Sequence, residues 1–215
     1  MKKIVKNELD ELIRRYSQLE VCKKDIEETY RLLQKTYDNN GKLLIAGNGG
    51  SAADSEHIAG ELMKRFKVTR PVSKDFAEKL MKVDPERGEK LAQNLEVPIR
   101  AVPLTSHVAI TTAYMNDADA AGVFAQQMLG FGDKGDAFLA ISTSGNSENI
   151  ISACVVAKAM GIKVIGLTGQ NESKLSKIAD ICIRVPETET YKIQELHLPV
   201  YHALCLMLES NYFGK

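Results

Sequence analysis

The sequence lacks the features that would direct a chain to a membrane, to nucleic acid or to the cell exterior. Its 215 residues contain 28 basic and 28 acidic side chains, so the net charge is +0 and no overall field attracts nucleic acid or anionic lipid. No window approaches 18 uncharged apolar residues, and the charged start, MKKIVKNELDELIRRY, is unlike a signal peptide. These absences predict a cytoplasmic protein with neither membrane nor nucleic acid as a partner.

Cysteine is also scarce, and its placement excludes a disulfide scaffold. The four cysteines lie scattered within apolar runs, and no two of them have CxxC spacing; they are Cys22, Cys154, Cys182 and Cys205. Such residues are typical of reduced thiols in a core. They agree with a cytoplasmic location.

Five short apolar or β-branched runs are spread along the chain, with helix-favouring segments between them. The runs are KLLIA (42–46), RAVPL (100–104), AFLAI (137–141), KVIGL (163–167) and DICIR (180–184). This alternation is typical of a parallel sheet covered by helices on both faces, with ligands at the carboxyl ends of the strands. The sequence therefore predicts an α/β three-layer sandwich with a five-stranded parallel sheet.

The domain organisation follows from the remaining segments. Residues 5–38 are charged and helix-favouring until DNNG at 38–41, which predicts one long helix or two in an N-terminal unit, 1–40. The sheet domain would occupy 41–215, with a charged helical insertion at about 73–99. Amphipathic N-terminal helices exceed what one sheet needs, and we expect them to mediate formation of a homo-oligomer.

A glycine-rich loop, GNGGSA (47–52), follows the first strand. Gly47, Gly49 and Ala52 fit the G-x-G-x-x-A pattern of a dinucleotide site. That site also requires a second strand about 20 residues later that ends in an acidic residue. Here the helix continues to ELMKRFKVTRP, so the loop does not predict a nucleotide.

A second loop, STSGNS (142–147), lies between the third strand and an amphipathic helix. Hydroxyl groups, free backbone N–H groups and the positive end of a helix dipole form a phosphate site without lysine. Ser147 alone would be explained as a helix cap. Four hydroxyls within six residues favour an anion site.

Two further sets of residues are candidates for chemistry. His57 and Glu61 are four apart, which places them on one helix face as half of a metal site or as a solvated pair. Gln194 and His202 are eight apart, about 12 Å along a regular helix, too far to reach one ion easily. Either Pro199 starts or kinks the helix, or different subunits share the site.

Together, GNGGSA, ISTSGNS and IQELHLPVYH resemble the sugar isomerase (SIS) domain and, within it, the phosphoheptose isomerases. The resemblance implies a flavodoxin-like fold and conversion of sedoheptulose 7-phosphate to D-glycero-D-manno-heptose 7-phosphate through an enediol. It also implies a homotetramer with shared active sites, and a product that supplies surface polysaccharide synthesis.

The resemblance assigns roles to individual residues. It implies a zinc ion held by His57, Glu61, Gln194 and His202, with Glu61 and His202 as acid and base in either order. It implies that the sugar phosphate contacts Asn48, Gly49, Gly50, Ser51, Asp117, Ser142, Thr143, Ser144, Ser147 and Gln194.

Two departures from the family pattern keep alternatives open. The 73–99 insertion is longer than the usual connection, and Tyr191 and Lys192 replace an Asp-Arg pair that often precedes Ile-Gln-Glu. The substrate could therefore be a different sugar phosphate. A non-catalytic SIS protein that binds a partner such as a replication initiator is the other alternative; such proteins lack the acid–base pair.

Overall fold

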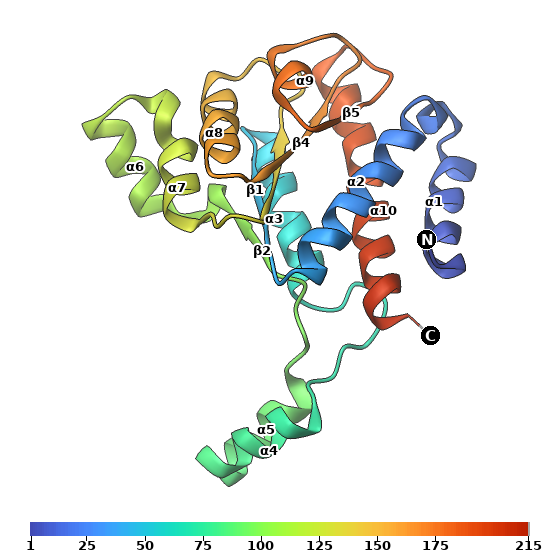
Figure 1. Cartoon of the computed structure of the whole chain (residues 1–215), viewed down its shortest axis with the longest axis vertical. Helices are drawn as coiled ribbons and strands as arrows, with labels where there is room; N and C mark the ends of the chain where they lie inside the picture. Colours follow the sequence, from blue (N-terminus) through green and yellow to red (C-terminus); the bar gives the residue numbers. More distant parts are fainter. Residues whose placement is uncertain (215) are drawn as a thin grey trace.

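The computed structural model describes residues 1–214, which form five strands and the helices around them (Figure 1). The strands are β1 (Leu43–Ala46), β2 (Ala101–Pro103), β3 (Ala137–Ile141), β4 (Lys163–Thr168) and β5 (Ile181–Arg184). They pair in parallel in the order β2-β1-β3-β4-β5. This is the flavodoxin-like order. The predicted α/β sandwich is therefore confirmed.

Helices cover both faces of the sheet, and alternate strand residues divide between two cores. Leu43 and Ile45 of β1 pack with α2 (Lys23–Asp38), α3 (Gly50–Met63) and α10 (Thr190–Phe213). Leu44 and Ala46 face the opposite core, which also contains residues of α7 (Val123–Phe131), α8 (Glu148–Ala159) and α9 (Lys174–Ile178). Burial on both faces explains why the strands read as continuous apolar runs.

The N-terminal segment forms two α-helices. The first, α1 (Lys3–Arg15), is capped by Tyr16, and a 3-10 turn, η1 (Ser17–Cys22), leads into α2. Val5, Leu9 and Leu12 of α1 are buried. They belong to the same core as residues of α10, so α1 adds a layer outside that helix (Figure 1).

Residues 74–94 form an antiparallel helical hairpin that projects from the body at the bottom of Figure 1. Ser73 caps α4 (Lys74–Val83), and Asp84 caps α5 (Pro85–Asn94) by accepting the Arg87 N–H. A bridge between Pro71 and Glu96 closes its base. No residue of α4 is buried, and Gly88 alone is buried in α5, so the hairpin packs on itself rather than on the main core.

The last helix, α10, runs through Pro199 without a break. Pro199 therefore does not start the helix, and Gln194 and His202 lie on the same continuous helix. The remaining elements are η2 (Leu104–Ser106), α6 (Val108–Asp117) and η3 (Ala120–Gly122). Among the helices of residues 1–214, none combines the length and the apolar character needed to cross a bilayer.

Candidate active site

The glycine loop turns the chain sharply from β1 into α3. Gly49 has φ 57° and ψ −121°, a conformation that other residues rarely adopt, and α3 begins at Gly50. Gly50 is needed for a second reason: a Cβ there would lie 2.4 Å from Nε2 of Gln194. Asn48 and Gly49 are exposed beside the turn, and Ser51 is buried in the first turn of α3.

The hydroxyl loop turns the chain from β3 into α8. Oγ atoms of Ser142 and Ser147 lie 3.1 Å apart, and Ser144 accepts the backbone N–H of Asn146 through its hydroxyl. Ser147 occupies the cap position of α8 but makes no side-chain cap bond, so the capping explanation for this residue is wrong. Its hydroxyl instead faces Ser142 and remains close to the helix N-terminus.

The two loops meet at the carboxyl edge of the sheet. The side-chain amides of Asn48 and Asn149 exchange two hydrogen bonds of 2.9 Å, joining the glycine loop to α8. A cavity of about 440 Å³ opens beside them, between these loops and α6 and α7; it is lined partly by Asn48, Ser147, Asn149, Thr111 and Met115. Strands β1 and β3 flank the point where the strand order reverses, which is where open α/β sheets bind ligands.

A separate cluster lies further along α3 and α10. Nε2 of His57 is 3.4 Å from Oε1 of Glu61, and the two side chains are 43% and 15% exposed. His202 of α10 packs edge-on against His57, with ring centroids 5.0 Å apart. The structure therefore brings together the imidazoles of His57 and His202 and the carboxylate of Glu61. The sequence analysis had assigned Glu61 and His202 as the acid and the base.

Tyr201 and Asp54, which sequence analysis missed, orient His57. Tyr201 donates its hydroxyl hydrogen to Oδ1 of Asp54 over 3.2 Å, so its oxygen accepts from Nδ1 of His57 over 3.0 Å. That arrangement places a hydrogen on Nδ1 of His57 and leaves Nε2 facing Glu61. A carboxylate three residues before His57 and a tyrosine next to His202 were the only signals in the sequence.

The environment of His202 favours its neutral form. Burial, and then the neighbouring His57, lower the pKa of His202, while Glu61 acts in the opposite direction. Nε2 of His202 is buried and has no hydrogen-bond partner among the described residues. An unpartnered buried nitrogen is costly unless a ligand, ion or substrate satisfies it.

The remaining predicted residues do not join this cluster. Gln194 lies against Gly50, and Gly50 is about two turns of α3 before His57. Asp117 is exposed at the end of α6, where its carboxylate accepts a hydrogen bond from the side-chain amide of Asn116. Thr143 and Ser144 line a second hollow of about 300 Å³ behind the hydroxyl loop. Within residues 1–214, no three His, Cys, Asp or Glu side chains are close enough together to hold a metal ion as they stand.

The chain was then compared with known proteins. A model of the SIS domain matches residues 101–210, and a second SIS domain model matches residues 8–101. The phosphoheptose isomerase of Akkermansia muciniphila is 33% identical over 214 residues, which cover 100% of each chain.

Solved structures give the same likeness. Phosphoheptose isomerase GmhA from Neisseria gonorrhoeae superposes with a TM-score of 0.73 at 31% identity, covering 94% of both chains. A phosphoheptose isomerase from Francisella tularensis gives a TM-score of 0.75 at 28% identity, covering 98% of this chain and 100% of its own.

Proposed function

Because this chain belongs to the phosphoheptose isomerase family of SIS domain proteins, we propose that it interconverts sedoheptulose 7-phosphate and D-glycero-D-manno-heptose 7-phosphate. The family predicted from the three sequence motifs is confirmed. The observation that carries the proposal is the cluster of His57, Glu61 and His202, which offers an acid–base pair apart from the hydroxyl loop.

The separation of the two groups suits this substrate. Its reacting atoms are carbons 1 and 2, and its phosphate is on carbon 7, at the other end of the molecule. Ser142, Thr143, Ser144 and Ser147 would take the phosphate at the positive end of α8. Lys174 is paired with Glu148 at this point, so hydroxyl and backbone N–H groups would supply most of the binding.

The acid–base pair would perform the aldose–ketose exchange. Glu61 removes the proton from the carbon beside the carbonyl, giving an enediol, and returns it to the neighbouring carbon. His202, neutral because its pKa is lowered, exchanges the hydroxyl protons between the two oxygens. The atoms balance without any redox partner, because the hydrogen that leaves one carbon is restored to the next.

A zinc ion is part of the proposal. The unpartnered Nε2 of His202, Nε2 of His57 and the Glu61 carboxylate are suitable zinc donors in kind. Glu61 and His202 would then transfer protons only through atoms that zinc does not hold. Bound zinc would supply a Lewis acid that stabilises the enediolate. Gln194 lies near Gly50, and this position suits contact with the substrate better than it suits a fourth zinc ligand.

We also propose a homotetramer with shared active sites, in the cytoplasm. The separation of Gln194 from His202 on one unbroken helix favours a site completed by a second subunit. Cys22, Cys154, Cys182 and Cys205 are free thiols, as expected in a reducing compartment. Burial raises the pKa of the Cys22 thiol to about 11, so it stays protonated and unreactive at neutral pH.

Turnover of sedoheptulose 7-phosphate by the purified protein tests the function. We expect turnover in the native protein, its loss in Glu61→Gln, and no change in Glu56→Gln, an exposed carboxylate on the same helix. Metal content and loss of activity with a chelator test the zinc separately. A folded oligomer that is inactive on this substrate but active on another sugar phosphate would show that the enzyme has a different substrate. Inactivity on a whole panel of sugar phosphates would favour a non-catalytic binding protein.

A further inference from the structure

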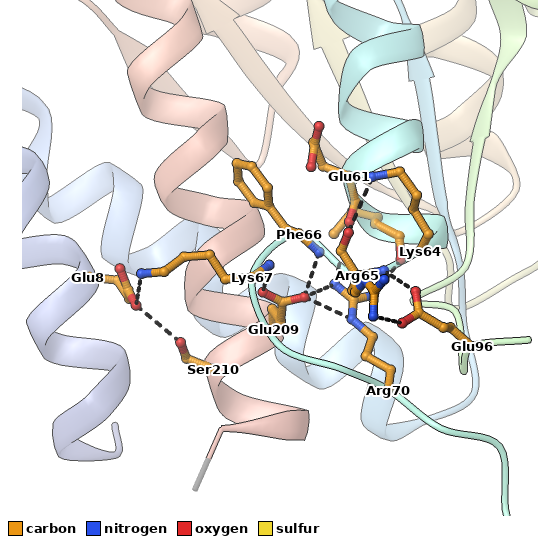
Figure 2. A network of polar contacts seen from close by, with 11 residues as sticks. Glu8, Glu61, Lys64, Arg65, Phe66, Lys67, Arg70, Glu96, Glu209 and Ser210 are labelled. Atoms are coloured by element: carbon orange, nitrogen blue, oxygen red, sulfur yellow. Dashed lines mark hydrogen bonds and ion pairs between the residues drawn. The ribbon is translucent and has the colours of Figure 1, made fainter. Parts of the chain in front are cut away.

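A buried ion pair joins the chain that leaves α3 to the C-terminal half of α10. Nη2 of Arg70 lies 2.7 Å from Oε1 of Glu209, and the two side chains are 0% and 1% exposed. Nε of Arg70 donates to the same oxygen over 3.0 Å. Figure 2 shows the Glu209 carboxylate at the centre of this network. The remaining polar atoms of a pair so far from solvent need hydrogen-bond partners. Those partners show which segments the pair holds in place.

The Glu209 carboxylate holds the segment that follows α3. Its Oε1 accepts the backbone N–H of Phe66 over 2.8 Å, and its Oε2 accepts that of Lys67 over 2.7 Å. Burial alone would raise the pKa of Glu209, but these two N–H groups and the Arg70 guanidinium lower it below its usual range. The carboxylate is therefore ionised and fully bonded at neutral pH.

The Arg70 guanidinium holds the end of α3 itself. Nη1 donates to the carbonyl oxygen of Leu62 over 2.7 Å, and Nη2 lies 3.4 Å from that of Glu61. These are carbonyl groups of the last turn of α3, which have no partner within the helix. A cation at this end also interacts favourably with the helix dipole. The pair thus fixes the last turn of α3 directly to α10.

This connection spans the two helices that carry the acid–base pair. Glu61 belongs to the turn of α3 that Arg70 caps, and His202 lies two turns before Glu209 on α10. Phe66, whose N–H is held by Glu209, packs on the His202 ring with centroids 5.4 Å apart. Any movement of α3 along α10 would change the distance between the Glu61 carboxylate and the His202 imidazole.

We propose that Arg70 and Glu209 are positioning residues for the isomerase, a role that rests on the proposed function above. They set the register of α3 against α10, and through Phe66 they fix the His202 ring. Neither touches the substrate. Their loss would lower kcat more than it changes KM, because the phosphate and sugar contacts lie at the sheet edge.

The test must separate positioning from stability. Removing one partner leaves a buried charge, so Arg70→Met or Glu209→Leu alone strongly destabilises the fold. Replacing both with apolar residues is often neutral for stability. The double variant Arg70→Met with Glu209→Leu therefore keeps the core packed, yet it frees the N–H groups of Phe66 and Lys67 and leaves the Leu62 carbonyl with the Ile99 N–H as its remaining partner.

The structure offers a matched control at the start of strands β1 and β3. Lys42 pairs with Asp136 over 2.7 Å, and Asp136, 3% exposed, accepts the backbone N–H groups of Lys42 and Asp133. The double variant Lys42→Met with Asp136→Leu removes a pair of the same kind that makes no hydrogen bond or ion pair to His57, Glu61 or His202. Both double variants and Arg70→Lys, which keeps the charge, would be compared with the native protein.

For the Arg70/Glu209 double variant, we expect kcat about 10- to 100-fold lower with KM within about threefold, on the scale of a misplacement near 1 Å. Arg70→Lys should recover part of kcat, and the control variant should keep native kcat. A folded Arg70/Glu209 double variant with native kcat would overturn the proposal, as would an equal loss of kcat in the control.

A crystal structure of the Arg70/Glu209 double variant gives a readout that does not depend on activity. We expect residues 64–70 and the last turn of α3 to be displaced along α10. Unchanged positions of Glu61 and His202 would overturn the proposal. If the native protein itself did not turn over sedoheptulose 7-phosphate, the proposed function would fail, and this structure would still decide whether the pair sets the register.

Discussion

The hydroxyl of Tyr201 provides a sharp test of how the cluster is assembled. It is the only described donor to Oδ1 of Asp54, whose second oxygen, Oδ2, is buried without a partner, and it orients His57 over 3.0 Å. Tyr201→Phe removes both contacts and leaves the ring, which is 1% exposed, in place. The change is therefore confined to one oxygen atom.

The expected magnitudes follow from these contacts. A hydrogen bond to a charged group contributes about 1.5–3 kcal/mol, so Tyr201→Phe should lower the free energy of unfolding by that amount. Part of the loss is recovered if Asp54 takes up a proton, since burial already raises the pKa of Asp54. Loss of the group that orients His57 should reduce kcat about 10- to 100-fold, as found for residues behind metal ligands.

Tyr212→Phe is the matched control. Tyr212 donates to Oδ1 of Asp38 over 2.8 Å and lies 3.1 Å from the carbonyl of Gln34, near the opposite edge of the sheet. Asp38 is exposed, so water can replace the hydroxyl and the stability loss should be about 0.5–1.5 kcal/mol. Steady-state kinetics and urea unfolding of both variants are the assays. Native kcat in a folded Tyr201→Phe protein would refute the reasoning.

Three further predictions concern regions outside this cluster. Because the folded-state pKa of Glu209 is lowered, its stabilisation is complete above the unfolded pKa of about 4.3 and is lost as the pH falls through the folded value. Unfolding free energies measured between pH 7 and 3 should therefore fall less steeply in the Arg70→Met, Glu209→Leu double variant, and equal slopes would contradict this. A short Gly-Ser turn that joins Ser73 to Leu95 removes residues 74–94 and should change the free energy of unfolding by only about 0.5 kcal/mol, since the hairpin packs on itself. A chain that no longer folds would show that the hairpin supports the body of the protein. A change of oligomeric state in size-exclusion chromatography would place the hairpin at a subunit interface. Gly145 has φ 65°, and a Cβ there would lie 2.1 Å from Oγ of Ser173. Gly145→Ala should therefore lower the free energy of unfolding by more than the about 1–2 kcal/mol of left-handed backbone strain, and it should raise KM for the phosphorylated substrate. An unchanged KM would indicate that phosphate binds elsewhere.

Much of the architecture could be predicted from the sequence because its signals are local. Strand runs such as AFLAI at 137–141 are apolar throughout, since both faces of the sheet are covered, and each glycine or hydroxyl loop follows a strand directly. The strand order places both loops at one edge. The proximity of His57 and Glu61 was equally local, because four residues make about one helical turn.

Contacts between distant segments were decided only by tertiary structure. Sequence spacing could not say that α10 lies beside α3, so it left open where Gln194 and His202 would go; packing sends the first to Gly50 and the second to His57. The pair of Arg70 and Glu209 joins residues 139 positions apart and becomes valuable only when burial removes water from both charges. The sequence by itself determined the elements and the two loops, whose causes lie within a few residues. Which side chains meet across helices depended on how the apolar faces of α3 and α10 pack on the sheet, a property of the whole core.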